Sequence, residues 1–378
     1  HADSIWVGTY GNGMYLLDGQ GNVRVRSIAD PGRPQSLLDN RVSALLQDRT
    51  GLLWVGLWGR GVQTVDPRGA AFRFLGADVD LVGEEVTSIR RYPSEGAMLV
   101  TTYSGGVNVL DETGRLLTSV RAGEALGPQG PAEVLTAMRP EGGPLLVGTM
   151  RQGVEVVSRD GTRRSFPPNP DDSLAVPDAT VYDIATDPAG RIWVGTSLGL
   201  RRFDLATGTF HPATTDSTGL LLRNAFVRSL HAADDGTLWV PTLGLGVFAL
   251  DPSTGRTVRF HTGAFSAMGD DEVASVVTDG GFAWFGTRSA GTLHRASGWQ
   301  EGSTPRLERI GPTDGVGASV QCVAADRSGR VWAATSTQIV TVDPRSLALT
   351  SYGAADGVPA GEFRTASCEV GPDGQVWF

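Results

Sequence analysis

Residues 52–62 read LLWVGLWGRGV, an apolar run in which a tryptophan is followed two residues later by glycine and then by a short polar loop. The same order of residue types returns along the whole chain, which indicates repeated structural units. Clear copies are IWVGTYGNGM at 5–14, LLVGTMRQGV at 145–154, IWVGTSLGL at 192–200, LWVPTLGLGV at 238–247 and AWFGTRSAGT at 283–292; weaker copies are MLVTTYSGGV at 98–107, VWAATSTQI at 331–339 and QVWF at 375–378.

The tryptophan of each copy, or the leucine in its place, marks the period of the repeat. Successive positions are 45 to 48 residues apart. Periods of this length are typical of propeller blades or of helical arrays. The segments here are short, rich in β-branched residues and bounded by Gly, Asp and Pro, so we expect strands. The marked positions are Trp6, Trp54, Leu99, Leu146, Trp193, Trp239, Trp284, Trp332 and Trp377.

One repeat contains four expected strands, at 41–48, 52–58, 61–67 and 71–76. A four-stranded antiparallel sheet covers neither of its faces, whereas radial stacking of such sheets covers both and leaves only short edges. We therefore predict an all-β fold over residues 1–378, a β-propeller of four-stranded antiparallel blades. The count of repeats allows eight blades closed by the two ends of the chain. It equally allows seven blades with part of a neighbouring propeller.

The repeated tryptophans are predicted to be structural wedges between neighbouring blades. The glycine that follows each one lets the adjacent backbone approach closely. Truncating a buried wedge of this kind to alanine costs about 3–5 kcal/mol. The residues assigned this role are Trp6, Trp54, Trp193, Trp239, Trp284, Trp332 and Trp377.

The composition excludes several classes of protein. The net charge of −9 argues against a surface that follows nucleic-acid phosphates. No run of 18 apolar residues is present, so no spanning helix is expected within the chain. Cys322 and Cys368 occupy equivalent places in two repeats; two packed small side chains are the favoured interpretation, and a bridge between neighbouring repeats is the alternative. Neither a metal site nor a cofactor is expected, because the sequence lacks the spacings that hold them.

The repeats resemble the two-component regulator propeller family. Its pattern, roughly D..G.lWvGT..GGl..ld, matches at 48–66, 187–204 and 235–251, and residues 352–378 are similar to the family's closing repeat. The resemblance implies an extracytoplasmic ligand-sensing region of a hybrid histidine kinase or a diguanylate cyclase, with periplasmic or extracellular placement and with a homodimer as one form of the receptor. It also implies two rings of seven blades, with residues 1–76 ending the first ring and 77–378 forming the second.

The chain begins at His1 without a methionine and ends within a motif, which indicates a fragment. The output domain and any attachment to a membrane are then expected only in a segment beyond it, and the fragment itself is not expected to be an enzyme.

Recognition is expected on one face of the ring. Strand direction alternates within a blade, so the loops between the second and third strands and the connections between blades open on the same face. These loops vary in sequence and carry aromatic and arginine side chains, which suit a small molecule, an oligosaccharide or an anionic glycan. The candidate ligand-binding residues are Tyr10, Asn40, Arg41, Trp58, Arg60, Tyr103, Arg151, Asn224, Arg288 and Arg364.

Two other functions stay open at the level of sequence. Propeller glycoside hydrolases or lyases need two carboxylates across a cleft, and the adjacent pairs at 84–85, 171–172 and 270–271 are the available carboxylates. These pairs fit solvated turns better than a catalytic dyad. The remaining possibility is a platform for protein–protein interaction.

Overall fold

The computed structural model describes residues 5–29, 36–47, 53–65, 81–83, 85–92, 96–111, 114–121, 133–214, 217–311, 316, 319–353, 356, 358, 363–365, 367–371 and 374–378. The chain forms two compact units. Unit 1 contains residues 1–74 and 352–359, and unit 2 contains residues 75–351 and 360–378. Within the described residues, no helix combines the length and the apolar character that crossing a bilayer requires.

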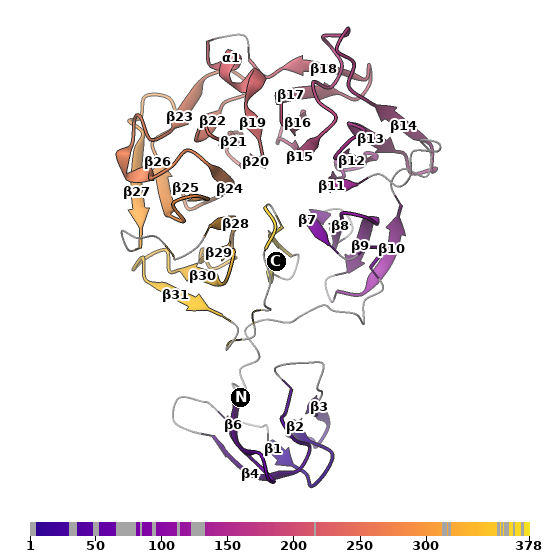
Figure 1. The fold of residues 1–378 in the computed structure, drawn as a ribbon, viewed down its shortest axis with the longest axis vertical. Coiled ribbons are helices and arrows are strands. Elements are labelled where there is room, and N and C mark those ends of the chain that lie inside the picture. The colour runs from indigo at the N-terminus through magenta and orange to yellow at the C-terminus, as the bar shows by residue number, and fades with distance from the viewer. Residues whose placement is uncertain are drawn as a thin grey trace. The chain divides into compact units, whose positions relative to one another are not determined.

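In the described residues, unit 2 contains six sheets of four or five strands, each built from strands that follow one another in the sequence. Figure 1 shows the sheets arranged around a common centre, with the first strand of each sheet innermost. The first sheet contains β7 (Val86–Tyr92), β8 (Ala97–Thr102), β9 (Gly106–Asp111) and β10 (Leu116–Val120), and the second contains β11 (Val134–Met138), β12 (Leu145–Thr149), β13 (Val154–Val157) and β14 (Arg163–Phe166). The third sheet contains β15 (Val181–Thr186), β16 (Ile192–Thr196), β17 (Gly199–Asp204) and β18 (Thr209–Pro212), and the fourth contains β19 (Phe226–Val227), β20 (His231–Ala232), β21 (Leu238–Leu243), β22 (Val247–Leu250) and β23 (Thr257–Phe260). The fifth sheet contains β24 (Val273–Asp279), β25 (Phe282–Thr287), β26 (Leu293–Ser297) and β27 (Arg306–Ile310), and the sixth contains β28 (Val320–Ala325), β29 (Val331–Thr335), β30 (Ile339–Val342) and β31 (Leu349–Tyr352).

A short hairpin of β32 (Glu369–Val370) and β33 (Val376–Trp377) follows the sixth sheet. It lies between the β28 and β7 strands near the centre of the ring (Figure 1) and contacts both. The all-β propeller of four-stranded antiparallel sheets is confirmed. Six sheets and one further hairpin are consistent with seven blades, and the number of blades stays a prediction.

The sheets of unit 2 are held together by apolar side chains between neighbouring blades. Trp193, Trp239 and Trp284 are 2%, 0% and 2% exposed, and each lies in a core cluster formed with the following sheet. The glycine of the motif allows this approach. A Cβ on Gly195 would lie 2.6 Å from Val227 Cγ1 of the next blade, which no real side chain tolerates. Trp332 and Trp377 are half-buried.

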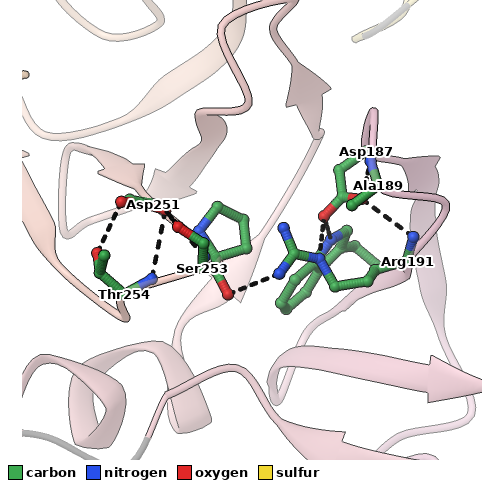
Figure 2. Close-up of polar contacts among 8 residues, drawn as sticks. Asp187, Ala189, Arg191, Asp251, Ser253 and Thr254 are labelled. Carbon is green, nitrogen blue, oxygen red and sulfur yellow. Dashed lines mark hydrogen bonds and ion pairs between the residues drawn. The ribbon is translucent and has the colours of Figure 1, made fainter.

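The turn before Trp193 is held by a network of hydrogen bonds to one aspartate. The Asp187 carboxylate accepts bonds from the Ala189 amide at 3.0 Å, from Arg191 Nε at 2.6 Å and from Trp193 Nε1 at 2.9 Å. The Arg191 guanidinium also donates to the carbonyl oxygen of Pro252, in the next blade, at 2.8 Å. Figure 2 shows the Asp187 turn beside the turn of Asp251. In this repeat Asp187 therefore fixes the turn and orients Trp193, and Arg191 ties two blades together.

Asp251 orders the turn that contains Pro252, the acceptor of the Arg191 bond, in the same way. Its carboxylate accepts hydrogen bonds from Ser253 Oγ at 2.6 Å and Thr254 Oγ1 at 2.7 Å (Figure 2). These hydroxyl donors, that of Ser253 first, lower the pKa of Asp251 to about 2. The turn is therefore built around a charged carboxylate at any pH above that value.

Unit 1 contains two three-stranded sheets, β1 (Ile5–Gly8), β2 (Met14–Leu17) and β3 (Val23–Ser27), followed by β4 (Val42–Gln47), β5 (Leu53–Leu57) and β6 (Gly61–Val65). Met14 packs with Leu53, Val55 and Leu57 in one core, and Trp6 is half-buried against it. Trp54 was expected to be a buried wedge, but its side chain is 44% exposed. The alternation of β5 places Trp54 on the face opposite Val55, and among the described residues the first sheet of unit 1, through Met14 and Trp6, packs on the Val55 face.

Three features of unit 2 differ from the expectation of strands alone. Helix α1 (Ser217–Asn224) occupies the connection before β19, where a run of leucines favours a helix. A single 3-10 turn, η2 (Ser266–Met268), precedes β24. Cys322 and Cys368 form a disulfide with a Cα–Cα distance of 6.0 Å, so the favoured interpretation of two unpaired side chains was wrong. The bridge forms because β28 and the C-terminal hairpin are neighbours around the ring.

Candidate functional site

The two sets of loops predicted to share a face are joined by a repeated hydrogen bond. The first amide after the second strand donates to the carbonyl of the residue just before the first strand of the same blade. Because the contact recurs from blade to blade, the loops and the connections between blades lie on the same face within each unit. The pairs are Trp58 to Arg41 at 3.0 Å, Tyr103 to Glu85 at 2.8 Å, Met150 to Glu133 at 2.8 Å, Arg288 to Glu272 at 2.8 Å and Ser336 to Ser319 at 2.9 Å.

In unit 1 this contact gathers three of the predicted residues. Tyr10 forms a bridge with Arg41, and the Tyr10 and Trp58 rings meet edge to face with centroids 6.0 Å apart. Tyr10 is 72% exposed and Trp58 57%, so both rings present surface to solvent. We call Tyr10, Arg41 and Trp58 the unit 1 aromatic cluster. Arg60 is exposed in the adjoining loop.

Asn40 and Arg41 make hydrogen bonds within unit 1 that hold its segments together. The Asn40 carbonyl accepts from the amides of Gly11 and Gly13 at 3.1 and 2.9 Å, and its side-chain Oδ1 accepts from the Ala29 amide at 2.6 Å. The Arg41 guanidinium donates to Asp39 at 2.7 Å and so lowers the pKa of that carboxyl. Asn40 therefore connects neighbouring segments of unit 1, and its ligand-binding role stays a prediction.

In unit 2, two of the predicted arginines are paired with glutamates that directly precede an innermost strand. Arg364 contacts Glu85 at 2.8 Å and Arg151 contacts Glu133 at 3.1 Å. All these side chains except that of Glu133 are more than half exposed, so each pair contributes only about 0–1 kcal/mol and is easily rearranged. The sequence analysis missed Glu133 and Glu272, whose signal is a glutamate directly before a strand that starts with valine.

Tyr103 and Asn224 differ in their relation to these arginines. The amide of Tyr103 binds the Glu85 carbonyl, which places Tyr103 beside the Glu85–Arg364 pair. Its hydroxyl also contacts Met150 Sδ of the next blade at 3.0 Å. Asn224 is exposed at the end of α1 and makes no described contact with the other predicted residues.

The innermost strands of unit 2 share a β-bulge at this face. The register shifts after the first residue of the strand, which leaves the second residue unpaired. Arg228 of the fourth sheet occupies the place of Tyr182 in the third, because Val227 pairs with Thr242 as Val181 pairs with Thr196. Bulges of this kind change the direction of a side chain and are frequent beside binding sites. The shifts fall at Val86/Ser88, Val134/Thr136, Val181/Asp183, Val273/Ser275 and Val320/Cys322.

A buried ionic network joins the innermost strands at positions that follow these bulges in the sequence. Asp183 is fully buried and accepts from Arg90 Nη2 at 2.6 Å, from Thr136 Oγ1 at 3.2 Å and from the Leu230 amide at 2.7 Å. It therefore links the first four sheets of the ring. Burial lowers the pKa of Arg90, but the charges of Asp183 and Glu369 outweigh it and raise the pKa. We call Arg90, Asp183 and their partners the axial network.

A cavity of about 80 Å³ lies against this network, and Arg90, His231 and Glu369 line it together with apolar residues of the fifth and sixth sheets. Burial raises the pKa of Glu369, and burial with the nearby Arg90 charge lowers the pKa of His231 to about 4. Sequence reasoning missed these residues.

The carboxylate pairs considered for hydrolysis are turn residues where the structure describes them. Asp270 accepts from the amides of Glu272 and Ala290, and Asp271 accepts from Thr262. Asp171 and Asp172 lie in a hydrogen-bonded turn with Asn169. Glu84 lies outside the described residues. Across the part of the chain that the structure describes, no three His, Cys, Asp or Glu side chains are placed to hold a metal ion.

Radial four-stranded sheets with variable loops on one face define the class of the fold as a β-propeller. Two segments, residues 36–59 and 175–197, match the family described as two component regulator propeller. No curated protein matches the sequence.

Solved structures resemble the chain over most or nearly all of its length. The extracellular domain of BT3049 from B. thetaiotaomicron, assigned as a hybrid two component system, is 20% identical with a TM-score of 0.68; the match covers 99% of this chain and 48% of that one. The extracellular domain of BT4673 from the same organism is 16% identical with a TM-score of 0.59, over 98% of this chain and 49% of that one. The WD40 repeats of RRP9 are 13% identical with a TM-score of 0.55, over 77% and 85%. The chain spans about half the length of the two extracellular domains.

Proposed function

We propose that this chain is the ligand-sensing β-propeller region of an extracytoplasmic two-component receptor, without catalysis of its own. The observation that carries the proposal is the loop face, where hydrogen-bonded loops present exposed aromatic and arginine side chains from a rigid frame. The two family matches and the two extracellular domains with the same fold support it. The Cys322–Cys368 disulfide supports a location outside the cytoplasm, because such bridges persist in oxidising compartments.

The wider receptor follows from the same proposal. Residues 1–76 would end a first propeller and residues 77–378 would form a second. The output would be a histidine kinase or diguanylate cyclase domain in a membrane-attached protein, with its propellers in the periplasm or outside the cell and with homodimers as the signalling form. The ligand would be an oligosaccharide, an anionic glycan or another small molecule, bound by the loop face.

A thermal-shift screen of the purified chain against neutral and acidic oligosaccharides tests this proposal. A ligand that binds only the folded state raises the melting temperature, and at one hundred times its Kd it contributes about 2.7 kcal/mol. We expect at least one saccharide to do so. Trp58→Ala and Arg60→Ala should weaken a ligand held by the unit 1 aromatic cluster, and Val23→Ala, an exposed strand position, serves as the matched control.

Two results would contradict the proposal or part of it. If no saccharide shifts the melting temperature of the wild-type chain, ligand sensing of this class is wrong. If a saccharide binds and both loop variants keep wild-type affinity, the assignment of the unit 1 aromatic cluster is wrong. Hydrolysis of a polysaccharide that Asp270→Asn abolishes would establish the alternative function of a propeller hydrolase.

A further inference from the structure

Arg228 lies in the gap that divides the innermost strand of the fourth sheet into β19 and β20. The gap has a structural cause, because the Leu230 amide donates to Asp183 and Ser229 Oγ donates to the Ala274 carbonyl at 2.9 Å, outside their own sheet. The Arg228 guanidinium lies 4.6 Å from the centroid of the Tyr182 ring. Among the described residues, no carboxylate lies within ion-pair distance of it.

Arg288 is brought to the same place by a continuous backbone ladder. Phe226 pairs with Leu243, Leu243 forms a bridge with Glu272, and the Glu272 carbonyl accepts the Arg288 amide at 2.8 Å. Neighbouring strands lie about 4.8 Å apart, so three such steps place the Arg288 backbone within roughly 15 Å of Phe226. The two long arginine side chains on this short ladder can therefore reach a common ligand.

Arg288 is also left without a full set of partners. Its Nε is buried and has no hydrogen-bond acceptor in the described structure. The neighbouring Glu272 carboxylate instead accepts from Ser289 Oγ at 2.9 Å. A buried guanidinium nitrogen without an acceptor is costly, and an anion bound at this position removes that cost.

The electrostatic environment also favours an anion. Burial lowers the pKa of Arg228, the charges of Arg288 and Arg364 lower it further, and Tyr182 opposes them. Arg364 already has Glu85 as a partner, whereas Arg228 and Arg288 have no described carboxylate partner. Guanidinium groups bind carboxylate and sulfate oxygens with paired hydrogen bonds, which makes such a cluster suited to oxyanions.

We propose that Arg228 and Arg288 form an oxyanion-binding subsite on the loop face of unit 2, which takes the carboxylate or sulfate group of an acidic saccharide. The subsite rests on the proposed sensing function and names the chemistry of its ligand. Tyr182 holds the Arg228 guanidinium from one side, so Tyr182 positions the subsite rather than contacting the oxyanion.

Titration calorimetry of the purified chain tests the subsite with sodium glucuronate, glucose and sodium sulfate as probes. Glucuronate and sulfate differ in the source of the oxyanion, and glucose lacks one. We expect glucuronate or sulfate to bind and glucose to bind at least tenfold more weakly. Arg228→Gln and Arg288→Gln should each weaken binding of the oxyanion at least tenfold, because each removes a charge-assisted contact. Arg306→Gln, an exposed arginine on the outer strand β27, should leave binding unchanged.

Protection from phenylglyoxal, followed by mass spectrometry, gives a second readout. Arg228 and Arg288 should be modified in the free chain and protected by the binding oxyanion, while Arg306 is modified equally in both. Failure of both oxyanions to bind or to protect overturns the subsite, as does binding that neither variant changes. If a neutral oligosaccharide still raises the melting temperature in that case, the sensing function stands and only its acidic ligand is wrong.

Discussion

The axial network and the oxyanion subsite use similar residues in opposite ways. Arg90 is buried beside Asp183, whose carboxylate is fully satisfied by donors from several sheets. Arg228 and Arg288 are also partly buried, yet they have no described carboxylate partner and one buried nitrogen lacks an acceptor. A buried charge with all its partners holds neighbouring sheets of the ring together. An incompletely paired one costs stability and is explained by a ligand that completes it.

The largest expected effect comes from removing the carboxylate of the axial network. Asp183→Ala leaves Arg90 buried without its carboxylate and removes the acceptor of the Leu230 amide, so we expect a loss of about 3–5 kcal/mol in the free energy of unfolding. Urea denaturation followed by tryptophan fluorescence measures it. Glu301→Ala, at an exposed turn, is the control. A loss below about 1 kcal/mol would show that the network is dispensable.

A second comparison uses two tryptophans at the same position of the repeat. Trp239 is fully buried between two blades, so Trp239→Ala should cost about 3–5 kcal/mol. Trp54 is 44% exposed, and Trp54→Ala should cost no more than about 1.5 kcal/mol in the same chain. Thermal and urea unfolding of both variants test the difference. Equal losses would mean that Trp54 is as well packed as Trp239.

The axial region should also make stability depend on pH through His231. Its Nε2 accepts from the Thr278 amide at 3.2 Å, and its pKa is lowered from 6.5 to about 4, so the folded chain favours the neutral ring. The resulting stability is complete above pH 6.5 and is lost as pH falls from 6.5 to 4. One such histidine accounts for a loss on the order of 3 kcal/mol.

Buried His294, whose pKa is also about 4, adds a loss of the same sign, and Glu369, with a raised pKa, acts in the opposite direction at higher pH. Urea unfolding of His231→Gln at pH 7 and at pH 4.5 should show a smaller change between the two values than the wild-type chain shows. An unchanged difference would contradict the assignment to His231.

The smallest expected effect comes from removing an arginine of the oxyanion subsite. Without ligand, Arg228→Gln relieves repulsion from Arg288 and Arg364, so its stability should equal that of the wild-type chain or exceed it by up to about 1 kcal/mol. Denaturation in a buffer free of oxyanions, with Arg306→Gln beside it, measures this. A loss of 2 kcal/mol or more would place Arg228 in the frame of the ring.

The sequence predicted the sheets because the period repeats, and it predicted the buried Trp193, Trp239 and Trp284 because each copy needs the same wedge. It also predicted that the loops would share one face, since this follows from alternating strand direction alone. The ligand-binding role of that face stays a prediction.

Other features depend on which particular residues meet across blades. Arg90 and Asp183 are 93 positions apart, and no local pattern pairs them. The two cysteines were equivalent by repeat position, and only the contact of β28 with the final hairpin makes them neighbours. Arg228 was missed because the division of β19 from β20 follows from the distant Asp183.

The Cys322–Cys368 bridge changes how a force applied near the C-terminal hairpin is transmitted to the sheets of the ring. It connects β28 directly to the residue before β32 and shortens a route of 46 residues along the backbone to a single side-chain link. A pull applied beyond Cys368 first separates the two-residue strands β32 and β33, and at Cys368 the bridge passes the load to β28, a strand inside a complete four-stranded sheet. Covalent bonds do not yield on the scale of such forces, so Cys368 and the sixth sheet move together.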